Sequence, residues 1–103
     1  MNDVNRRTQI KLNIHIEPVG SLTMDDYDFT VEAYTSLMKI VTFKKADTIR
    51  VDESNYFLPI DTAMLGTGRL MCSVIATLPD PDMPEGTRRE VTAIDTGINI
   101  VAK

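Results

Sequence analysis

The chain has 103 residues, a formal net charge of −4 and a hydrophobic content of 43%. These values are typical of one soluble globular domain with a modest core, and they argue against nucleic acid as the main partner. The single cysteine excludes an intrachain disulfide. No apolar run approaches the length of a membrane-spanning helix, and we expect no signal peptide because no apolar segment follows the N-terminus.

Apolar and polar residues alternate along the first half of the chain, which is the pattern of half-buried β-strands. The clearest case is residues 9–17, where four apolar side chains share one face. Pro18 and Gly20 then end this strand in a turn. Further strands are predicted at residues 29–34, 38–44, 48–51 and 56–60.

One helical turn and one central strand are expected next. Residues 61–66 are predicted to form the turn, with Asp61 or Thr62 capping its start and Gly66 closing it in a left-handed conformation. Residues 69–78 carry apolar side chains on both faces. A strand of that kind is buried on both sides, so we expect it at the centre of its sheet.

A proline-rich loop divides the two strands of a long predicted hairpin. Residues 79–87 contain three prolines and Gly86, so they cannot form a regular element. The chain is expected to return as a strand at residues 88–94, to turn at residues 95–97 and to end in a short strand at residues 98–101.

The sum of these elements predicts the fold class. Seven or eight short strands at spacings near ten residues favour an all-β fold, a small antiparallel β-sandwich of the immunoglobulin-like or jelly-roll-like kind. The sandwich is expected to span residues 9–103. Residues 1–8 have little to bury, and we expect them to form a flexible N-terminal arm.

The chain has few residues of the types that most often act in catalysis or bind metals. His15 is the only histidine and lies on the polar face of its strand, so it is expected to face solvent rather than act as a base. Cys72 is in phase with Leu70 and Val74, which favours a buried structural thiol over a nucleophile. We therefore predict no catalytic residue, no cofactor and no metal site.

Two acidic loops leave calcium open as an alternative, because carboxylates are the ligands that hard cations prefer. Neither loop has the spacing of an EF-hand, and solvated acidic turns are much commoner than calcium sites. The carboxylates in question are Asp25, Asp26 and Asp28 in one loop and Asp80, Asp82 and Glu85 in the other.

Candidate interface residues come from the basic N-terminus and from the proline-rich loop. Arginine suits ion pairs across interfaces, so the basic cluster is expected either to be solvated or to dock on an acidic neighbouring subunit. A proline-rich hairpin projects as a rigid contact loop. The interface set is Arg6, Arg7, Pro81, Asp82, Met83, Pro84 and Arg88.

Four segments resemble small β-domains of tailed-bacteriophage virions: residues 52–62, 65–70, 79–91 and 96–100. In such domains a strand ending in an Asp-Thr-like turn precedes a glycine-kinked strand, and a Pro-Asp-rich hairpin carries a Gly-x-Arg element. The chain is similar to the N-terminal domain of upper baseplate proteins. It is also similar to domains of head fibres and decoration proteins in phages that infect gut Bacteroidetes.

The resemblance implies a non-enzymatic assembly module of the virion, often trimeric, that supplies no catalytic residues. Expected partners are capsid, fibre, tail or baseplate subunits and further copies of the chain, with no nucleic acid and no membrane. Full baseplate and fibre proteins usually continue into further domains, so the chain corresponds to an auxiliary protein or to an attachment domain. Assembly would take place in the cytoplasm of the host bacterium.

Two other functions are considered. A carbohydrate-binding or adhesion β-sandwich is the alternative, although its sites usually use exposed Trp or Tyr rings, and the chain has no Trp and three Tyr. A small enzyme is the weakest alternative, because a single His and a single Cys leave few groups for acid–base or nucleophilic chemistry.

Overall fold

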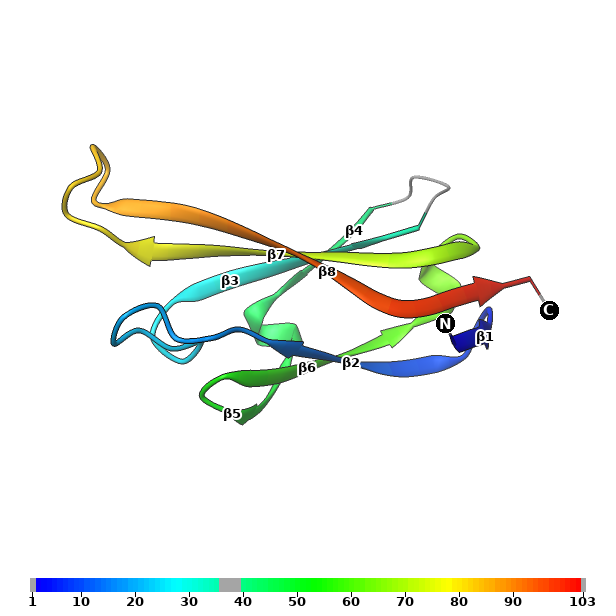
Figure 1. The fold of residues 1–103 in the computed structure, drawn as a ribbon. Helices are drawn as coiled ribbons and strands as arrows, with labels where there is room; N and C mark the ends of the chain where they lie inside the picture. Colours follow the sequence, from blue (N-terminus) through cyan, green and yellow to red (C-terminus); the bar gives the residue numbers. More distant parts are fainter. Residues whose placement is uncertain (1, 36–39, 103) are drawn as a thin grey trace.

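The computed structural model describes residues 2–35 and 40–102, and within them every regular element is a strand or a short 3-10 helix (Figure 1). The strands are β1 (Asn2–Asn5), β2 (Gln9–His15), β3 (Asp28–Tyr34), β4 (Val41–Lys44), β5 (Ile49–Asp52), β6 (Asn55–Asp61), β7 (Gly68–Pro79) and β8 (Thr87–Val101). The 3-10 helices are η1 (Lys45–Asp47) and η2 (Thr62–Met64). None of the described helices could span a bilayer.

Two sheets face each other, which confirms the all-β sandwich. One sheet has five strands in the order β1-β8-β7-β3-β4, and the other has three in the order β2-β6-β5. All pairs are antiparallel except β1 and β8, which run parallel. The long strand β7 lies at the centre of the larger sheet, as its two apolar faces predicted.

The N-terminus differs from the unpaired arm that we expected. Residues 2–5 form β1 and pair with Ile98–Val101 at the end of β8. The linker to β2 is held as well, because the Arg6 amide donates to the Val101 carbonyl at 2.8 Å. Backbone pairing at a free sheet edge orders this segment although it has few apolar side chains.

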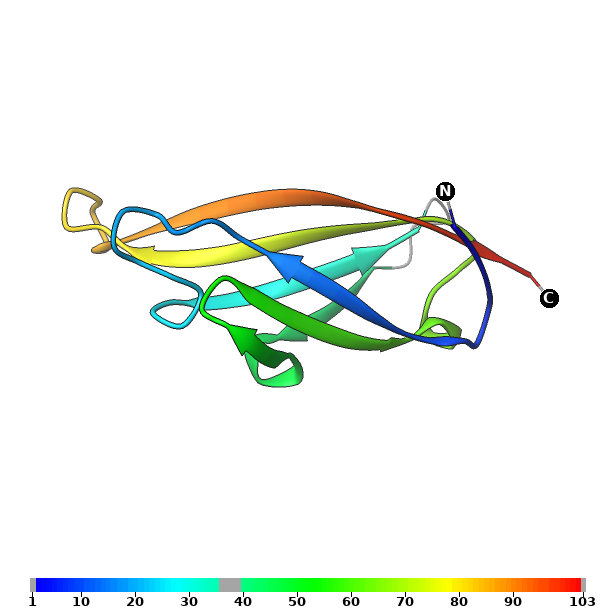
Figure 2. The same ribbon diagram turned by 60° about the horizontal axis from the view of Figure 1, so that its bottom comes forward.

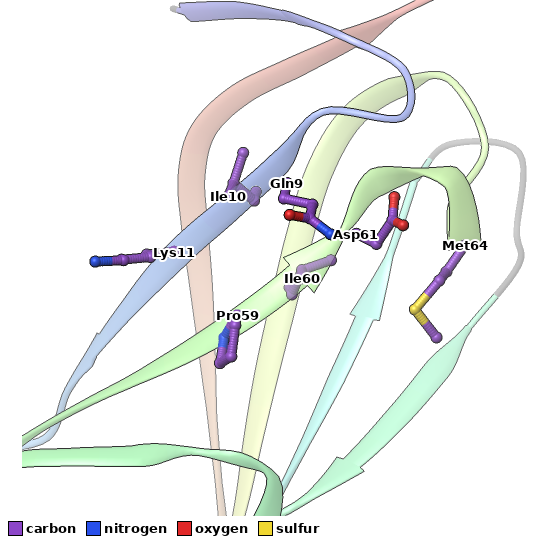
Figure 3. Close-up of a pocket in the computed structure, with 7 residues that line it drawn as sticks. All are labelled: Gln9, Ile10, Lys11, Pro59, Ile60, Asp61 and Met64. Carbon is purple, nitrogen blue, oxygen red and sulfur yellow. The ribbon is translucent and has the colours of Figure 1, made fainter.

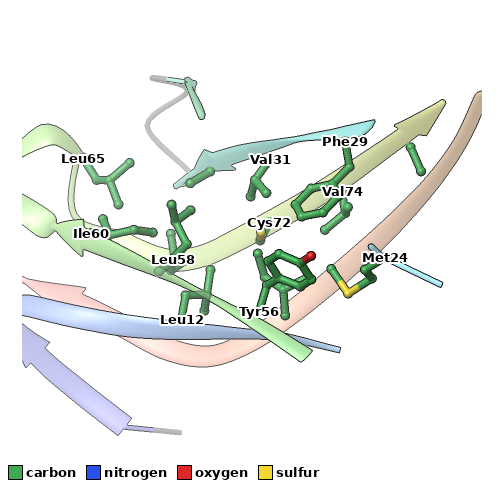
Figure 4. Packing of buried hydrophobic residues seen from close by; sticks show 14 of the residues in the cluster. Leu12, Met24, Phe29, Val31, Tyr56, Leu58, Ile60, Leu65, Cys72 and Val74 are labelled. Atoms are coloured by element: carbon green, nitrogen blue, oxygen red, sulfur yellow. The ribbon is translucent and has the colours of Figure 1, made fainter. Parts of the chain in front are cut away.

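The core lies between the two sheets and is formed mainly by the inward faces of β2, β3, β6 and β7 (Figure 4). In β6 every second residue is buried, and in β2 Leu12 and Ile14 are buried while Ile10 is half-buried. In β7 five alternate residues are buried from Leu70 to Leu78. Phe29 meets Tyr56 edge to face, with ring centroids 5.4 Å apart. The largest fully buried side chains are Phe29, Ile14, Met24, Leu58, Ile60, Leu65, Leu70, Leu78 and Ile100.

The helical turn before β7 is confirmed in part. Asp61 caps η2, because its side chain accepts a hydrogen bond from the Ala63 amide at 2.9 Å. The turn ends at Leu65 in an extended conformation, so Gly66 does not close it as expected. Gly68 has the positive φ instead, at 114°, where the chain enters β7.

The last part of the chain is one strand rather than two strands and a turn. Asp95 pairs with Met71 and Asn99 pairs with Arg69, so residues 96–98 bulge opposite Leu70. The Thr96 hydroxyl donates to the Leu70 carbonyl at 2.8 Å and accepts from the Ile98 amide. These side-chain bonds replace the missing ladder bonds, so the turn-forming residues make a bulge inside β8.

The remaining strands predicted in the first half of the chain are confirmed near their expected positions. One of them is shorter than expected. The strand expected at residues 38–44 is seen as β4 from Val41 onward. Met38 and Lys39 lie outside the described residues. Lys45 then begins η1 rather than a loop.

The molecule is elongated, and the β7–β8 hairpin accounts for its length. Its principal extents are 49 × 27 × 22 Å and its radius of gyration is 14.7 Å, against about 13 Å for a compact chain of 100 residues. Figures 1 and 2 show the hairpin reaching past the end of the smaller sheet, far from the N-terminus.

Candidate interaction surface

The tip of the β7–β8 hairpin is a closed loop with its own hydrogen bonds. The Asp80 amide donates to the Gly86 carbonyl, and the Gly86 amide donates to the Met83 carbonyl, both at 2.9 Å. The Asp82 amide donates to the Asp80 side chain at 3.0 Å. Gly86 has a φ of 76°, which a residue with a Cβ rarely adopts. The loop is therefore internally braced, as the prolines predicted.

Arg88 ties this loop to β8. Its guanidinium lies 3.2 Å from a carboxylate oxygen of Asp80 and 3.2 Å from one of Glu90. The side chain of Asp80 is only 18% exposed, so the loop folds over it. Arg88, expected at an interface, thus bonds within its own hairpin. The other loop residues of the interface set, Pro81, Asp82, Met83 and Pro84, are exposed at the tip.

The edge of β8 is open beside this loop. From residue 87 to residue 95, β8 pairs with β7 on one side and with no described strand on the other. β1 covers the edge only from Ile98 onward. In an antiparallel strand alternate residues direct their amide and carbonyl groups to each side, so this edge presents unpaired backbone donors and acceptors. Val91, at its middle, is 60% exposed.

The two N-terminal arginines lie elsewhere. Arg6 donates from its guanidinium to the carbonyls of Leu65 and Ala63, each at 3.2 Å. It therefore braces η2 against the N-terminal linker. Arg7 is exposed and has a φ of 80°. These residues are at the opposite end of the molecule from the hairpin tip, so the predicted interface set does not form one continuous surface (Figure 1).

An open groove of about 590 Å³ lies over β2, β6 and η2 (Figure 3). Beside it, the ammonium group of Lys11 lies 5.3 Å from the centre of the Phe57 ring. The charged groups that line the groove are one ammonium and one carboxylate, and its apolar lining includes the exposed side chain of Met64. The lining residues are Gln9, Ile10, Lys11, Pro59, Ile60, Asp61 and Met64.

The first acidic loop is anchored to the smaller sheet through Asp25. Both carboxylate oxygens of Asp25 accept hydrogen bonds from Arg50, and one accepts from the Tyr56 hydroxyl. Arg50, then Tyr56, lowers the pKa of Asp25 to about 2. Burial, then the bond to Asp25, raises the pKa of Tyr56 to about 12. Sequence reasoning missed this cluster, because residues 25, 50 and 56 lie on separate elements with no shared motif.

Lys45 also holds this loop in place by hydrogen bonds to its backbone. Its ammonium group donates to the carbonyls of Met24 and Tyr27, both at 2.8 Å. Asp26 accepts from the Thr23 amide at 2.8 Å. The carboxylates of this loop are thus already hydrogen-bonded within the protein, Asp25 to distant residues and Asp26 and Asp28 to near neighbours. Among residues 2–35 and 40–102 no three acidic, histidine or cysteine side chains converge as metal ligands do.

His15 and Cys72 are placed as the sequence predicted. His15 is half exposed, and its ring nitrogens lie 2.9 Å from acceptors on Glu17 and Asn55. These bonds, that of Glu17 first, raise the pKa of His15. Cys72 is buried in β7, and burial raises the pKa of its thiol to about 11. A buried, protonated thiol is a poor nucleophile.

Comparison with protein-family models, with curated proteins and with solved structures gave no match. Function must therefore be inferred from the residues and geometry of the chain itself.

Proposed function

We propose that the protein is a non-enzymatic structural module of a bacteriophage virion. In this role it forms homo-oligomers and docks on neighbouring capsid, fibre, tail or baseplate proteins. The resemblance of four segments to virion β-domains supplies the setting. The observation that carries the assembly role is the open edge of β8 beside a braced, projecting loop.

An open strand edge favours association because it offers a row of unpaired backbone groups. A second strand can add to the sheet there and complete its hydrogen bonds. Most single-chain proteins blunt such an edge with charged side chains, proline, a bulge or a covering segment. The regular part of this edge, residues 87–95, carries charged side chains at Arg88, Arg89 and Glu90 but no proline. β1 covers only the last four residues of β8 in the described structure.

The loop at the tip supports docking for a different reason. Its backbone is already fixed by hydrogen bonds, so little conformational entropy is lost when it is bound. Met83 is 42% exposed at this tip, and methionine adapts its shape to varied partners. Pro81 and Pro84 flank it and further restrict the chain.

The test is a double substitution at the tip, Met83→Ser with Pro84→Ser. We expect wild-type protein to sediment as an oligomer or in complex with a virion partner, and the double variant to show weaker assembly. The unfolding free energy should stay within about 0.5 kcal/mol of wild type, because the changed side chains are exposed.

Met64→Ser is the matched control, because Met64 is also 42% exposed but lies in η2, away from the hairpin tip. It should leave sedimentation unchanged. If the double variant assembles as wild type does, the tip plays no part in docking.

The carbohydrate-binding alternative has less support. Tyr27 and Tyr56 are each only 5% exposed and pack in the core, so their rings offer no platform to a sugar. Tyr34 is half-buried. Binding on a glycan array by a monomeric protein would favour this alternative over assembly.

A further inference from the structure

We propose that the partner of the open β8 edge is a second copy of the chain. Residues 87–95 of the two copies pair antiparallel about a twofold axis, with Val91 facing the partner's Val91. This joins the two five-stranded sheets into one continuous sheet. The inference rests on the proposed assembly function and specifies one of its contacts.

The length of the regular edge selects this register. β8 pairs with β7 without interruption from Thr87 to Asp95, and then the bulge at residues 96–98 breaks the ladder. A bulge twists and bends its strand, so a partner strand follows the edge only up to that point. Val91 is the midpoint of residues 87–95. Centring the two copies there uses the whole regular segment of each.

Charge selects against the neighbouring registers. Directly opposed residues of an antiparallel pair point to the same face, so a twofold arrangement always places one residue opposite itself. Centring on Arg89 would oppose two guanidinium groups, and centring on Glu90 would oppose two carboxylates. Like charges in direct opposition are destabilising. Centring on Val91 opposes no like charges.

The register centred on Thr92 meets a different obstacle. It would place Arg88 opposite the partner's Thr96, and Thr87 opposite the partner's Gly97. Both partner positions lie in the bulge, where Gly97 has a φ of 72°. The ladder would therefore lose its outermost pairs at both ends.

Apolar contact favours the Val91 register. Val91 lies directly across from Ile75 of β7, on the face of the sheet that points away from the core. In the paired sheet these side chains would form a row with the partner's Val91 and the partner's Ile75. Val91 is 60% exposed in the single chain. β-branched pairs across strands stabilise a sheet, so the row explains an otherwise solvent-exposed valine.

Other free edges fit a partner strand less well. β1, β4 and β5 each have four residues, and the pairing of β5 with β6 is irregular between Arg50 and Asp52. β2 has seven residues, whereas the regular open segment of β8 is longer. Within the described residues, β8 thus offers the most backbone groups to a partner.

Single cysteines test the register on the full chain. Cys72 is buried, so it does not compete for oxidation. In the Val91→Cys variant the two introduced thiols lie on directly opposed residues, whose Cα atoms are about 4.5–5.5 Å apart, within reach of a disulfide. Thr92→Cys and Ala93→Cys are the controls, because both positions are exposed. Their Cα pairs would be about 8 Å and about 13 Å apart.

We expect Val91→Cys to form a disulfide-linked dimer under mild oxidation about a hundredfold faster than Ala93→Cys. At about ten micromolar protein, pairing raises the effective concentration of the thiols about a hundredfold, to the order of one millimolar. Equal rates at the three positions, or a maximum at Thr92, would overturn the register. A self-association that persists in sedimentation with no excess at Val91 would overturn β8 pairing but leave the assembly function intact. A strictly monomeric protein would also overturn β8 pairing. The proposed function would then be tested separately, by measuring binding to another virion protein.

Discussion

The two strands of the long hairpin have the same hydrogen-bond ladder but opposite surroundings. In β7, the alternate side chains from Leu70 to Leu78 are at most 6% exposed. In β8, residues 89–93 are all exposed. β7 is the central strand of the larger sheet and packs one face against the core, while residues 87–95 of β8 pair with β7 and with no other described strand. The comparison shows that backbone pairing can hold a strand in place and leave its side chains and outer edge free for a partner.

Ion pairs differ between the same two regions. In the body, Asp25 and Arg50 join segments 25 residues apart and hold a loop against the smaller sheet. In the hairpin, Arg88 bonds to Asp80 and Glu90, which are eight and two residues away. The body's ion pair is thus part of the tertiary structure, and the hairpin's ion pairs brace a local loop.

The largest effect is expected from truncating a buried residue of β7. Leu70→Ala should lower the unfolding free energy by about 2–5 kcal/mol, because it leaves a cavity between the sheets. The same truncation on the exposed strand, Val91→Ala, should change it by less than about 0.5 kcal/mol. Urea denaturation measures both. Similar losses at the two sites would mean that the first half of β8 is packed rather than free.

A smaller effect is expected at the bulge that divides β8. Thr96→Val removes the hydroxyl that bonds to the Leu70 carbonyl and the Ile98 amide, and should cost about 1 kcal/mol per lost bond. Thr92→Val, the same change on the exposed regular segment, is the control and should be near neutral. The measurement is again urea denaturation. A neutral Thr96→Val would show that the backbone alone maintains the bulge.

The smallest effect concerns acid stability. The pKa of Asp25 falls from its usual 3.8 to about 2 on folding, so the stabilisation is complete above about pH 4 and is lost as the pH falls towards 2. Asp25→Asn should weaken this dependence, as measured by thermal unfolding across that range. Asp82→Asn, at the exposed tip, should keep the wild-type profile. The side chain of Asp25 is one-third exposed, so solvent screening limits the effect.

Raising the pH above 10 should also lower the stability of the protein, through Tyr56 in the same cluster. The pKa of Tyr56 is raised from 10.0 to about 12. The stabilisation of the folded state by the protonated Tyr56 hydroxyl is therefore complete below pH 10 and is lost as the pH rises towards 12. A Tyr56 hydroxyl that titrates near pH 10 by ultraviolet absorbance would contradict its burial and its bond to Asp25.

Local pattern determined much of this protein. Alternation of apolar and polar residues located β2, β3 and β7, the prolines located the hairpin loop, and the phase of Cys72 predicted its burial. These features depend on neighbours within a few residues, so the sequence alone determines them.

Only the tertiary structure decided which strands meet and which edges stay open. Residues 2–5 pair because they lie beside the end of β8, and residues 96–98 form a bulge because β7 continues opposite them. Asp25 serves as a structural anchor because folding places it beside Arg50 and Tyr56. The edge of β8 is open over residues 87–95 because β1 pairs only with Ile98–Val101. Pairing of this kind depends on contacts distant in sequence, which no local pattern encodes.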